Sequence, residues 1–361
     1  MELNRRKFIQ STGLFLGYNL LPFSPIPFPF NQKKIGVCLV GLGNYSESVL
    51  APALQLTNHC KLTGIVTGTP SKIPVWQKKY DLKDKNVYNY ENIHQIANNP
   101  DIDVIYIVLP TGLHAKYAIK AAYTGKHVWC EKPMAKTVAE CQAIIDACNK
   151  NKVKLSIGYR MQHEPNTQQI IQWGKTKPYG KIKEVNAEIG YNVTNVEKTW
   201  RLDAELGGGT MYDLGVYALN ASRYATAEEP LSVTAKQMTT RPTIFTETDE
   251  TTHFTLEFPS GAMAHGKTSI GKDMHLLQVD CENGWYKLAP FSMYNGVKGE
   301  TSDGKLLNQY IENQQAKQMD DDALAIIHNT AVIVPGEEGM KDIRIVEAIY
   351  QAAKTNSKIN L

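Results

Sequence analysis

The sequence predicts two consecutive domains of mixed α/β structure. In the first, strand-like apolar runs alternate with amphipathic helical runs, which is typical of a parallel sheet covered by helices on both faces. After Met161 this alternation stops, and strand-like runs follow one another with few helices between them. That change indicates a large, open-faced and mostly antiparallel sheet. We therefore expect an arm at residues 1–32, a first domain at 33–160 and a second at 161–361.

Composition excludes several classes of function. The chain has 361 residues, 42% of them hydrophobic, which suffices for two cores. Its formal net charge is +3 with Lys and Arg scattered, so we expect no nucleic-acid partner. No run reaches the roughly 20 apolar residues of a membrane span. The six cysteines show neither zinc nor disulfide spacing, which suggests small buried hydrophobes. We expect no metal, because four histidines show no paired spacing: His94, His253, His265 and His275.

The N-terminus resembles a targeting segment. Arg5 and Arg6 precede a modestly apolar run, as in a twin-arginine export signal, so we expect a periplasmic protein. The alternative is a frayed cationic tail on a cytoplasmic protein, and no Ala-x-Ala cleavage site is visible. The following "PFSPIPFPF" predicts an extended, polyproline-like arm.

A glycine motif follows the first strand of the first domain. In "KKIGVCLVGLGNYSESVL", an apolar run leads to Gly41-x-Gly43 and then to a helical stretch, with Ser46 at the sixth position of the motif. Small residues there let the backbone turn tightly and approach a pyrophosphate at a helix N-terminus. We predict a Rossmann dinucleotide-binding domain in which cofactor contacts come from this turn: Gly41, Leu42, Gly43, Asn44 and Tyr45. Pro52 predicts a kink or an irregular turn in the helix that follows.

The end of the second strand indicates whether the domain binds NAD(H) or NADP(H). An NAD site usually has Asp or Glu at its end, whereas "KLTGIVTGT" ends at Thr67-Gly68, with Lys72 close behind. A hydroxyl and an ammonium bind a 2′-phosphate that a carboxylate would repel. The sequence therefore favours NADP(H). The alternative is an ordinary polar turn with a solvated lysine.

Three further segments follow strand-like runs and should share the ligand-binding edge of the parallel sheet. They are "LPTGLH" with Leu109, Pro110, Thr111 and His114, the Glu131-Lys132-Pro133 triplet, and "GYR" with Arg160. We expect Arg160 to meet the nicotinamide end of the cofactor. His114 fits a helix cap equally well.

In the second domain, one helical segment interrupts the strands. "WRLDAELGGGTMYDLGVYALNASRYA" carries three glycines and then Asp213 and Tyr217, which share a helix face because they are four residues apart. Such a pair can also be purely structural. Trp200 and Arg201 fit contacts with the sugar or cofactor, or a core tryptophan beside a surface arginine.

Taken together, these motifs resemble the glucose–fructose oxidoreductase branch of the Gfo/Idh/MocA oxidoreductases. The resemblance runs from about Ile35 to the C-terminus and includes "YIVLPTGLHAKYAI", "GKHVWCEKPMA", "WRLDAELGGG" and "PGEEGM". Many relatives have His where this chain has Tyr217. The glucose–fructose oxidoreductase branch has Ser where this chain has Thr67. Residues 294–319 match poorly.

The resemblance implies a fold and an activity. It implies an open sheet used to form a homo-oligomer, a dimer or tetramer, and tightly held NADP(H). It also implies ping-pong hydride transfer from an aldose, giving an aldonolactone, to a ketose or another carbonyl, giving an alditol. The alternatives are an ordinary dehydrogenase that releases its cofactor, acting on an aldose or anhydrosugar, and a non-catalytic NADP-binding sugar sensor.

The chemistry assigns roles to the site residues. A phenol with an ordinary pKa near 10 is a poor base at neutral pH, and we expect the Lys132 ammonium to lower that pKa. Tyr217 then exchanges the proton, and Asp213 holds a sugar hydroxyl or orients Lys132. We expect the substrate to contact these three residues and also Arg201 and, by the resemblance, Tyr286.

Overall fold

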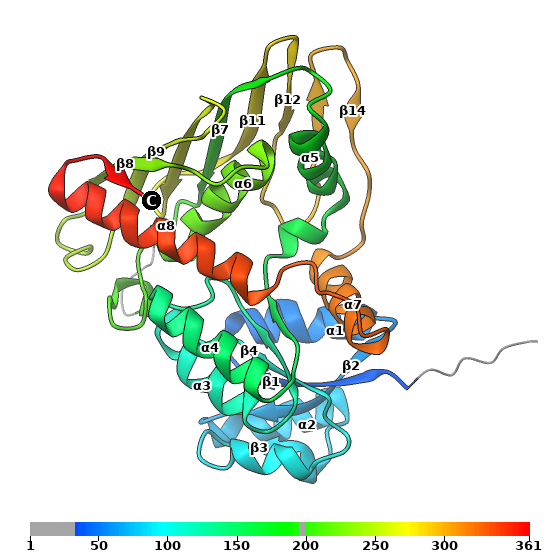
Figure 1. The fold of residues 1–361 in the computed structure, drawn as a ribbon. Coiled ribbons are helices and arrows are strands. Elements are labelled where there is room, and N and C mark those ends of the chain that lie inside the picture. Colours follow the sequence, from blue (N-terminus) through cyan, green and yellow to red (C-terminus); the bar gives the residue numbers. More distant parts are fainter. Residues whose placement is uncertain (1–32, 195–198) are drawn as a thin grey trace, which may run out of the picture. The chain divides into compact units, whose positions relative to one another are not determined.

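The computed structural model describes residues 33–194 and 199–361. The predicted export signal and arm at residues 1–32 lie outside this range. The described chain contains two sheets with helices packed against them (Figure 1). Among the described residues, no helix has both the length and the apolar character that a membrane span needs.

Sheet A forms the first domain and is parallel throughout. Its six strands lie in the order β3 (Val87–Tyr88), β2 (Cys60–Val66), β1 (Ile35–Val40), β4 (Val104–Ile107), β5 (His127–Cys130) and β6 (Leu155–Ile157). The helices of this part are α1 (Ala51–Leu56), α2 (Ile73–Tyr80), α3 (His114–Ala122) and α4 (Val138–Lys150). Short 3₁₀ turns span Pro70–Lys72, Asp84–Asn86, Ile93–Asn98 and Thr111–Leu113. This strand order is that of the Rossmann fold, and it confirms the predicted dinucleotide-binding architecture.

Local sequence explains these elements. The central strands β4 and β5 are apolar and almost wholly buried, as expected for strands covered on both faces. Helix α4 begins at a capping box. The Thr137 side chain accepts the Glu140 backbone N–H, and the Glu140 carboxylate accepts the Thr137 backbone N–H. A π-helical turn, Ser46–Leu50, precedes α1, and Pro52 lies in the first turn of α1. The irregular turn predicted from Pro52 is therefore confirmed.

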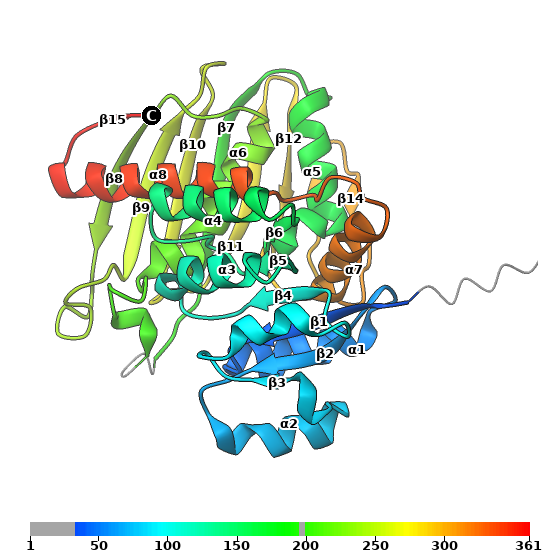
Figure 2. The same cartoon turned by 60° about the horizontal axis from the view of Figure 1, so that its bottom comes forward.

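Sheet B forms the second domain, and only its β7–β10 pair is parallel. The order is β14 (Leu306–Leu307), β13 (Gly299–Thr301), β12 (Gly284–Leu288), β11 (Met274–Cys281), β7 (Ile182–Gly190), β10 (Met263–Ser269), β9 (Thr251–Glu257), β8 (Ser232–Met238) and β15 (Ile359–Asn360). Three helices pack on one side of this sheet in both ribbon views (Figures 1 and 2): α5 (Pro165–Thr176), α6 (Val216–Thr226) and α8 (Gly336–Thr355).

Residues along the central strands of sheet B alternate in burial. On β9, Thr252, Phe254 and Leu256 are buried, while the residues between them are half-exposed. The buried set faces the helices, and the other set forms a polar outer face. This is the open-faced, mostly antiparallel sheet that the sequence predicted.

One helix of the second half returns to the first domain. Helix α7 (Gln314–Ile327) packs against α1 and β2, and its Met319 is buried in the same cluster as Val37 and Leu54. The Asp320 carboxylate accepts the backbone N–H groups of Asn58 and His59 at 2.8–3.0 Å. The expected domain of residues 161–361 therefore contributes a layer to the Rossmann domain. The sequence analysis predicted neither this helix nor the surface on which it packs.

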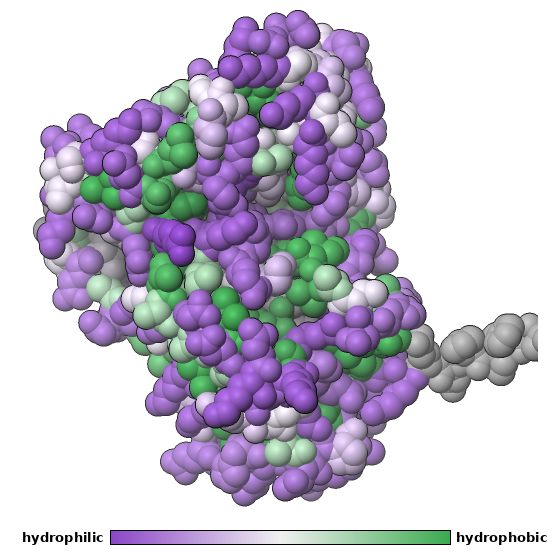
Figure 3. Space-filling model, in the orientation of Figure 1, coloured by the Kyte–Doolittle hydropathy of each residue, from purple (hydrophilic) through white to green (hydrophobic). Residues whose placement is uncertain are grey.

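The face drawn in Figure 3 is hydrophilic at both ends. Hydrophobic side chains gather midway between the two sheets, around α4 and the segment that leads into α8. Ile333 in that segment is among the exposed large hydrophobic residues. Exposure of a single large hydrophobic residue such as Ile333 is normal for a folded protein.

The packing of α7 can be tested through stability. Met319 is fully buried, so Met319→Ala should lower the free energy of unfolding by about 2–5 kcal/mol through lost burial and the cavity left behind. Lys317→Ala, an exposed change on the same helix, should cost less than about 0.5 kcal/mol. Denaturant unfolding would measure both. Equal, small effects would contradict the packing of α7 on the Rossmann layer.

Candidate active site

The Glu131-Lys132-Pro133 triplet lies at the carboxyl end of β5. The buried Glu131 carboxylate accepts the Tyr106 hydroxyl at 2.6 Å and the Lys132 backbone N–H at 3.2 Å. Burial raises the pKa of Glu131, against the hydrogen bond from Tyr106. The Lys132–Pro133 peptide bond is cis. Glu131 therefore anchors the turn from beneath, and its role is to fix the backbone that presents Lys132.

Lys132 reaches the second domain. Its Nζ donates to the Asp213 backbone carbonyl at 2.6 Å and lies 4.7 Å from the centroid of the Tyr217 ring. Asp213 belongs to a π-helical turn, Met211–Gly215, that leads into α6, where Tyr217 lies. The structure thus brings together the three residues that the sequence assigned to catalysis. The Asp213 carboxylate itself accepts from Arg201 Nε at 2.6 Å, so Asp213 holds Lys132 through its main chain.

Tyr217 is 7% exposed, and its ring meets that of Tyr159 edge-on at 6.1 Å. Burial raises the pKa of Tyr217 to about 12, and the Arg160 guanidinium is the strongest influence that lowers it. The sequence analysis expected Lys132 to lower this pKa. That expectation is corrected in two respects, because loss of hydration dominates and because the opposing cation is Arg160.

The glycine motif forms a cradle suited to a dinucleotide. Gly41 has φ +94°, and a Cβ there would lie 2.3 Å from the Val108 carbonyl oxygen, so this position requires glycine. A Cβ at Gly43 would meet no atom within 4 Å, which leaves its backbone open to a ligand. The buried Ser46 hydroxyl donates to the Gly41 carbonyl at 2.6 Å and holds the turn closed. Leu42 is buried in the turn, while Asn44 and Tyr45 begin the helix that follows.

The end of β2 lies against this turn. Lys72 Nζ donates to the Leu42 carbonyl at 2.6 Å and is 3.5 Å from Glu47 in an exposed pair. The Thr67 hydroxyl accepts the Thr69 N–H at 3.0 Å, and Gly68 packs against the Tyr90 ring. The hydroxyl and the ammonium that the sequence assigned to a 2′-phosphate are therefore both at the end of the strand. The residues present fit a bound dinucleotide.

In the segment after β4, some residues are exposed toward the candidate site and others are buried and support the fold. Leu109 and Pro110 are partly exposed, whereas Thr111 is buried against Gly207 of the second domain. Both ring nitrogens of the buried His114 are within hydrogen-bonding distance of backbone carbonyls. Nδ1 is 2.8 Å from the Pro133 oxygen, and Nε2 is 2.7 Å from the Leu109 oxygen. His114 therefore ties two loops together, which corrects its assignment as a cofactor ligand.

The remaining predicted contacts separate into two places. Arg201 and Trp200 lie beside Asp213, with the Arg201 guanidinium 5.0 Å from the Trp200 ring. Tyr286 is 1% exposed on β12, where its ring packs on Trp173 and Tyr179 at 5.0 and 5.8 Å. Tyr286 is thus a core residue under α5, and its assignment to the sugar pocket is corrected. A strand position alone did not reveal which face it occupies.

The structure adds aromatic residues that sequence reasoning missed. Tyr294, in the loop after β12, lies 6.3 Å ring to ring from Tyr45 of the glycine turn. Tyr191 follows β7 and packs on His275 at 4.7 Å. The Tyr294 ring also faces the Arg160 guanidinium, with 4.6 Å between the ring centroid and the central carbon. No motif marks the two tyrosines, because they come from loops whose approach depends on the tertiary fold.

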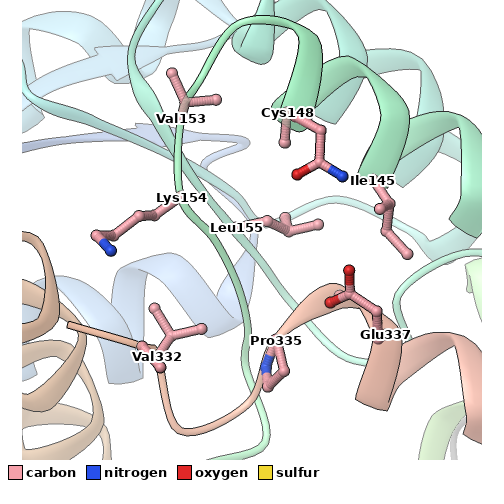
Figure 4. A pocket seen from close by; sticks show the side chains of 11 residues that line it. Ile145, Cys148, Val153, Lys154, Leu155, Val332, Pro335 and Glu337 are labelled. Atoms are coloured by element: carbon pink, nitrogen blue, oxygen red, sulfur yellow. The ribbon is translucent and has the colours of Figure 1, made fainter. Parts of the chain in front are cut away.

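A cavity of about 230 Å³ elsewhere in the chain is not this site. It opens between α4, the start of β6 and the segment before α8 (Figure 4), with Cys148, Leu155 and Pro335 among its lining residues. Leu155 is the first residue of β6, so the cavity lies at the amino end of that strand. Ligands of parallel sheets bind at the opposite, carboxyl edge.

Comparison with known proteins agrees with this geometry. The model of the oxidoreductase family with an NAD-binding Rossmann fold (GFO/IDH/MocA) matches residues 35–159. The model of the GFO/IDH/MocA C-terminal domain matches residues 167–287. D-xylose 1-dehydrogenase [NADP(+)] of Haloarcula marismortui is 26% identical over 350 residues, which cover 91% of this chain and 94% of that protein. The scyllo-inositol 2-dehydrogenase (NADP(+)) of Bacillus subtilis is 24% identical, covering 91% and 98%.

A solved structure is similar over nearly the same length. The aldose–aldose oxidoreductase of Caulobacter crescentus, crystallised with glycerol, superposes with a TM-score of 0.87 at 35% identity, covering 91% of this chain and all of that one. The two family matches together span more than half of the chain. The fold, the two domains and the family all agree with the resemblance seen in the sequence. The chain belongs to the GFO/IDH/MocA family of oxidoreductases.

Proposed function

We propose that this protein is a sugar oxidoreductase that keeps NADP(H) bound and passes hydride from an aldose to a second sugar carbonyl. The observation that carries the proposal is the meeting of Lys132 and Tyr217, 4.7 Å from Nζ to ring centroid, at the carboxyl edge of the Rossmann sheet. An ammonium beside a phenol at that edge suits proton exchange with a sugar hydroxyl. The names of the relatives, which include NADP(+)-dependent sugar dehydrogenases, support the same class of substrate.

NADP(H) is the cofactor that the donor set favours. The open backbone at Gly43 would take the pyrophosphate, and Thr67 with Lys72 would take the 2′-phosphate. When bound, NADP(H) would supply reversible hydride transfer to and from the sugar carbons. The carboxyl edge of sheet A would hold its nicotinamide near Lys132.

The protein's own groups manage the proton. In the oxidation, the aldose C1 carbon loses hydride while Tyr217 takes the proton from the C1 hydroxyl, which leaves an aldonolactone. Lys132 donates a hydrogen bond to the sugar oxygen, and its bond to the Asp213 carbonyl keeps the ammonium in place. In the return step, the second carbonyl carbon gains hydride and its oxygen takes the proton from Tyr217. A ketose or an aldose would both leave as an alditol.

A second candidate rests on the similarity to D-xylose 1-dehydrogenase [NADP(+)]. It is an aldose dehydrogenase that releases NADPH after each oxidation and needs no second sugar. The presence of both Lys132 and Tyr217 speaks against the third alternative, a sensor without catalysis. The candidates differ in the fate of the cofactor, which is directly measurable.

The outer face of sheet B provides a surface for self-association. Its half-exposed polar residues include Glu188 and Lys267, which form an ion pair at 2.6 Å across neighbouring strands. The outer face of a nine-stranded sheet with such residues suits a homo-oligomer, a dimer or tetramer, as the family resemblance implies.

The fate of the cofactor tests the proposal. We expect protein purified without added nucleotide to carry NADP(H), and an aldose alone to raise the reduced-nicotinamide absorbance by one equivalent per chain. A second sugar, a ketose or aldose, should then return the absorbance to its starting level. Absorbance that grows only with added free NADP+, beyond one equivalent, would support the releasing dehydrogenase. No change with any sugar would contradict both.

The two central residues should act as one unit. Tyr217→Phe removes the proton-exchanging hydroxyl but keeps the ring, so single-turnover reduction by an aldose should slow by about 10²–10⁴-fold. Lys132→Met should cost a similar factor, and the double variant should be little slower than either single one. Because the phenolate is the base, the wild-type rate should rise with pH. Bound NADP(H) should survive Tyr217→Phe, and a near wild-type rate in that variant would remove Tyr217 from the mechanism.

Export is proposed from the sequence alone. Arg5 and Arg6 precede a weakly apolar run, the pattern of a pathway that carries folded proteins across the inner membrane. Replacing both by Lys should leave the protein in the cytoplasm, still loaded with NADP(H). Cell fractionation would measure this, and an unchanged periplasmic fraction would contradict the proposal.

A further inference from the structure

Arg160 is an unusual buried cation. It follows β6 in a 3₁₀ turn, Arg160–His163, and it is 2% exposed. Its guanidinium donates to the Ser292 and Met293 carbonyls at 2.5 and 3.3 Å, to the Met161 sulfur at 2.9 Å and to the Gln314 side-chain oxygen. All four acceptors are neutral. Across residues 33–194 and 199–361, no carboxylate is hydrogen-bonded to Arg160, and its buried Nε has no hydrogen-bond partner.

A buried charge is costly unless something compensates it. Here the guanidinium faces the rings of two tyrosines, with its central carbon 5.2 Å from the centroid of Tyr217 and 4.6 Å from that of Tyr294. The four neutral acceptors fix its position. The structure therefore holds a positive charge, uncancelled by a bonded carboxylate, against the phenol that exchanges the proton.

We infer that Arg160 is a positioning residue for catalysis, whose buried guanidinium stabilises the phenolate form of Tyr217 during sugar oxidation. This inference rests on the proposed function, in which Tyr217 is the base. It gives Lys132 a separate task, because the Lys132 ammonium is bonded to the Asp213 carbonyl and is free to bind the sugar oxygen with its other protons. It also replaces the expectation that Arg160 binds the nicotinamide.

The electrostatics of the pocket agree with this division. Arg160 is the strongest influence that lowers the pKa of Tyr217, against the burial that raises it and against the Glu131 carboxylate. The other charged or titratable groups around the phenol come from every element that packs there: Lys132, Asp213, Tyr45, Tyr159, Tyr191 and Tyr294. Burial raises the pKa of the Tyr45, Tyr159 and Tyr294 phenols, and the Asp213 carboxylate is paired with Arg201.

The test compares three variants in the cofactor-loaded protein. Arg160→Gln removes the charge, so the rise of single-turnover aldose oxidation with pH should move upward by at least about one pH unit. Arg160→Lys keeps the charge and should bring the profile back toward that of the wild type. Gln314→Glu leaves Arg160 in place but gives it a carboxylate partner, so it should also move the profile upward. Gln351→Glu, an exposed change on α8, is the matched control and should not move it.

A merely structural role predicts a different outcome. If Arg160 only fills space, its variants would lower the rate equally at every pH, and Gln314→Glu would not shift the profile. Superimposable profiles, or an equal shift in Arg160→Lys and Arg160→Gln, would therefore overturn the inference. So would an unshifted profile in Arg160→Gln accompanied by loss of bound NADP(H), which would return Arg160 to the cofactor. Should Arg160→Gln fail to fold, Gln314→Glu alone still decides between these outcomes.

A second readout separates this inference from the proposed function. In protein labelled with carbon-13 at the tyrosine hydroxyl carbon, the Tyr217 signal is the one lost in Tyr217→Phe. Its ionisation should begin at lower pH in the wild type than in Arg160→Gln or Gln314→Glu, whether or not any sugar reacts. A lack of sugar oxidation with this ordering would count against the proposed function only. The same titration in all three proteins would overturn the role of Arg160.

Discussion

The bond from the Lys132 ammonium to the Asp213 backbone carbonyl is the contact on which the candidate site depends. It joins residues 81 positions apart, one at the end of a Rossmann strand and the other in the turn that leads into α6. Each of the two turns is held by its own contact. The turn that carries Lys132 is anchored by the bond between Glu131 and Tyr106, and the turn that carries Asp213 is held by the pair with Arg201. An ammonium has three protons, so this bond positions Lys132 and leaves donors for a substrate.

Burial sets the character of the site. The Tyr217 phenol sits where water is largely excluded, which raises its pKa to about 12 and would by itself make it a weaker participant at physiological pH. The same exclusion of water strengthens every charge that remains nearby. A buried guanidinium with neutral partners is therefore more effective there than an exposed lysine would be. The proposed chemistry needs both effects. A dry pocket protects hydride transfer from water, but it also disfavours ionisation of Tyr217, and a fixed cation offsets that penalty.

The two domains are interlocked by segments from late in the chain. Helix α7 returns from the second domain to cover α1 and β2, and the loop between β12 and β13 carries Ser292 and Tyr294 to Arg160. The site is consequently built from both domains, with Tyr45 of the glycine turn facing Tyr294 of the sheet domain. Movement of one domain against the other would disturb cofactor contacts and the catalytic pair together.

The sequence by itself determined the Rossmann architecture and the open antiparallel sheet, because strand periodicity and the glycines of the turn are local features of the chain. It also proposed Lys132, Asp213 and Tyr217 as the catalytic residues, through the resemblance of their motifs to a known family. Only the tertiary structure decided that Arg160 rather than Lys132 is the cation that most lowers the pKa of Tyr217, that Tyr286 lies in the core, and that His114 ties two loops. The physical reason is distance along the chain. Arg160 and Gln314 are 154 residues apart, and no local pattern specifies which side chains packing will bring together from such separations.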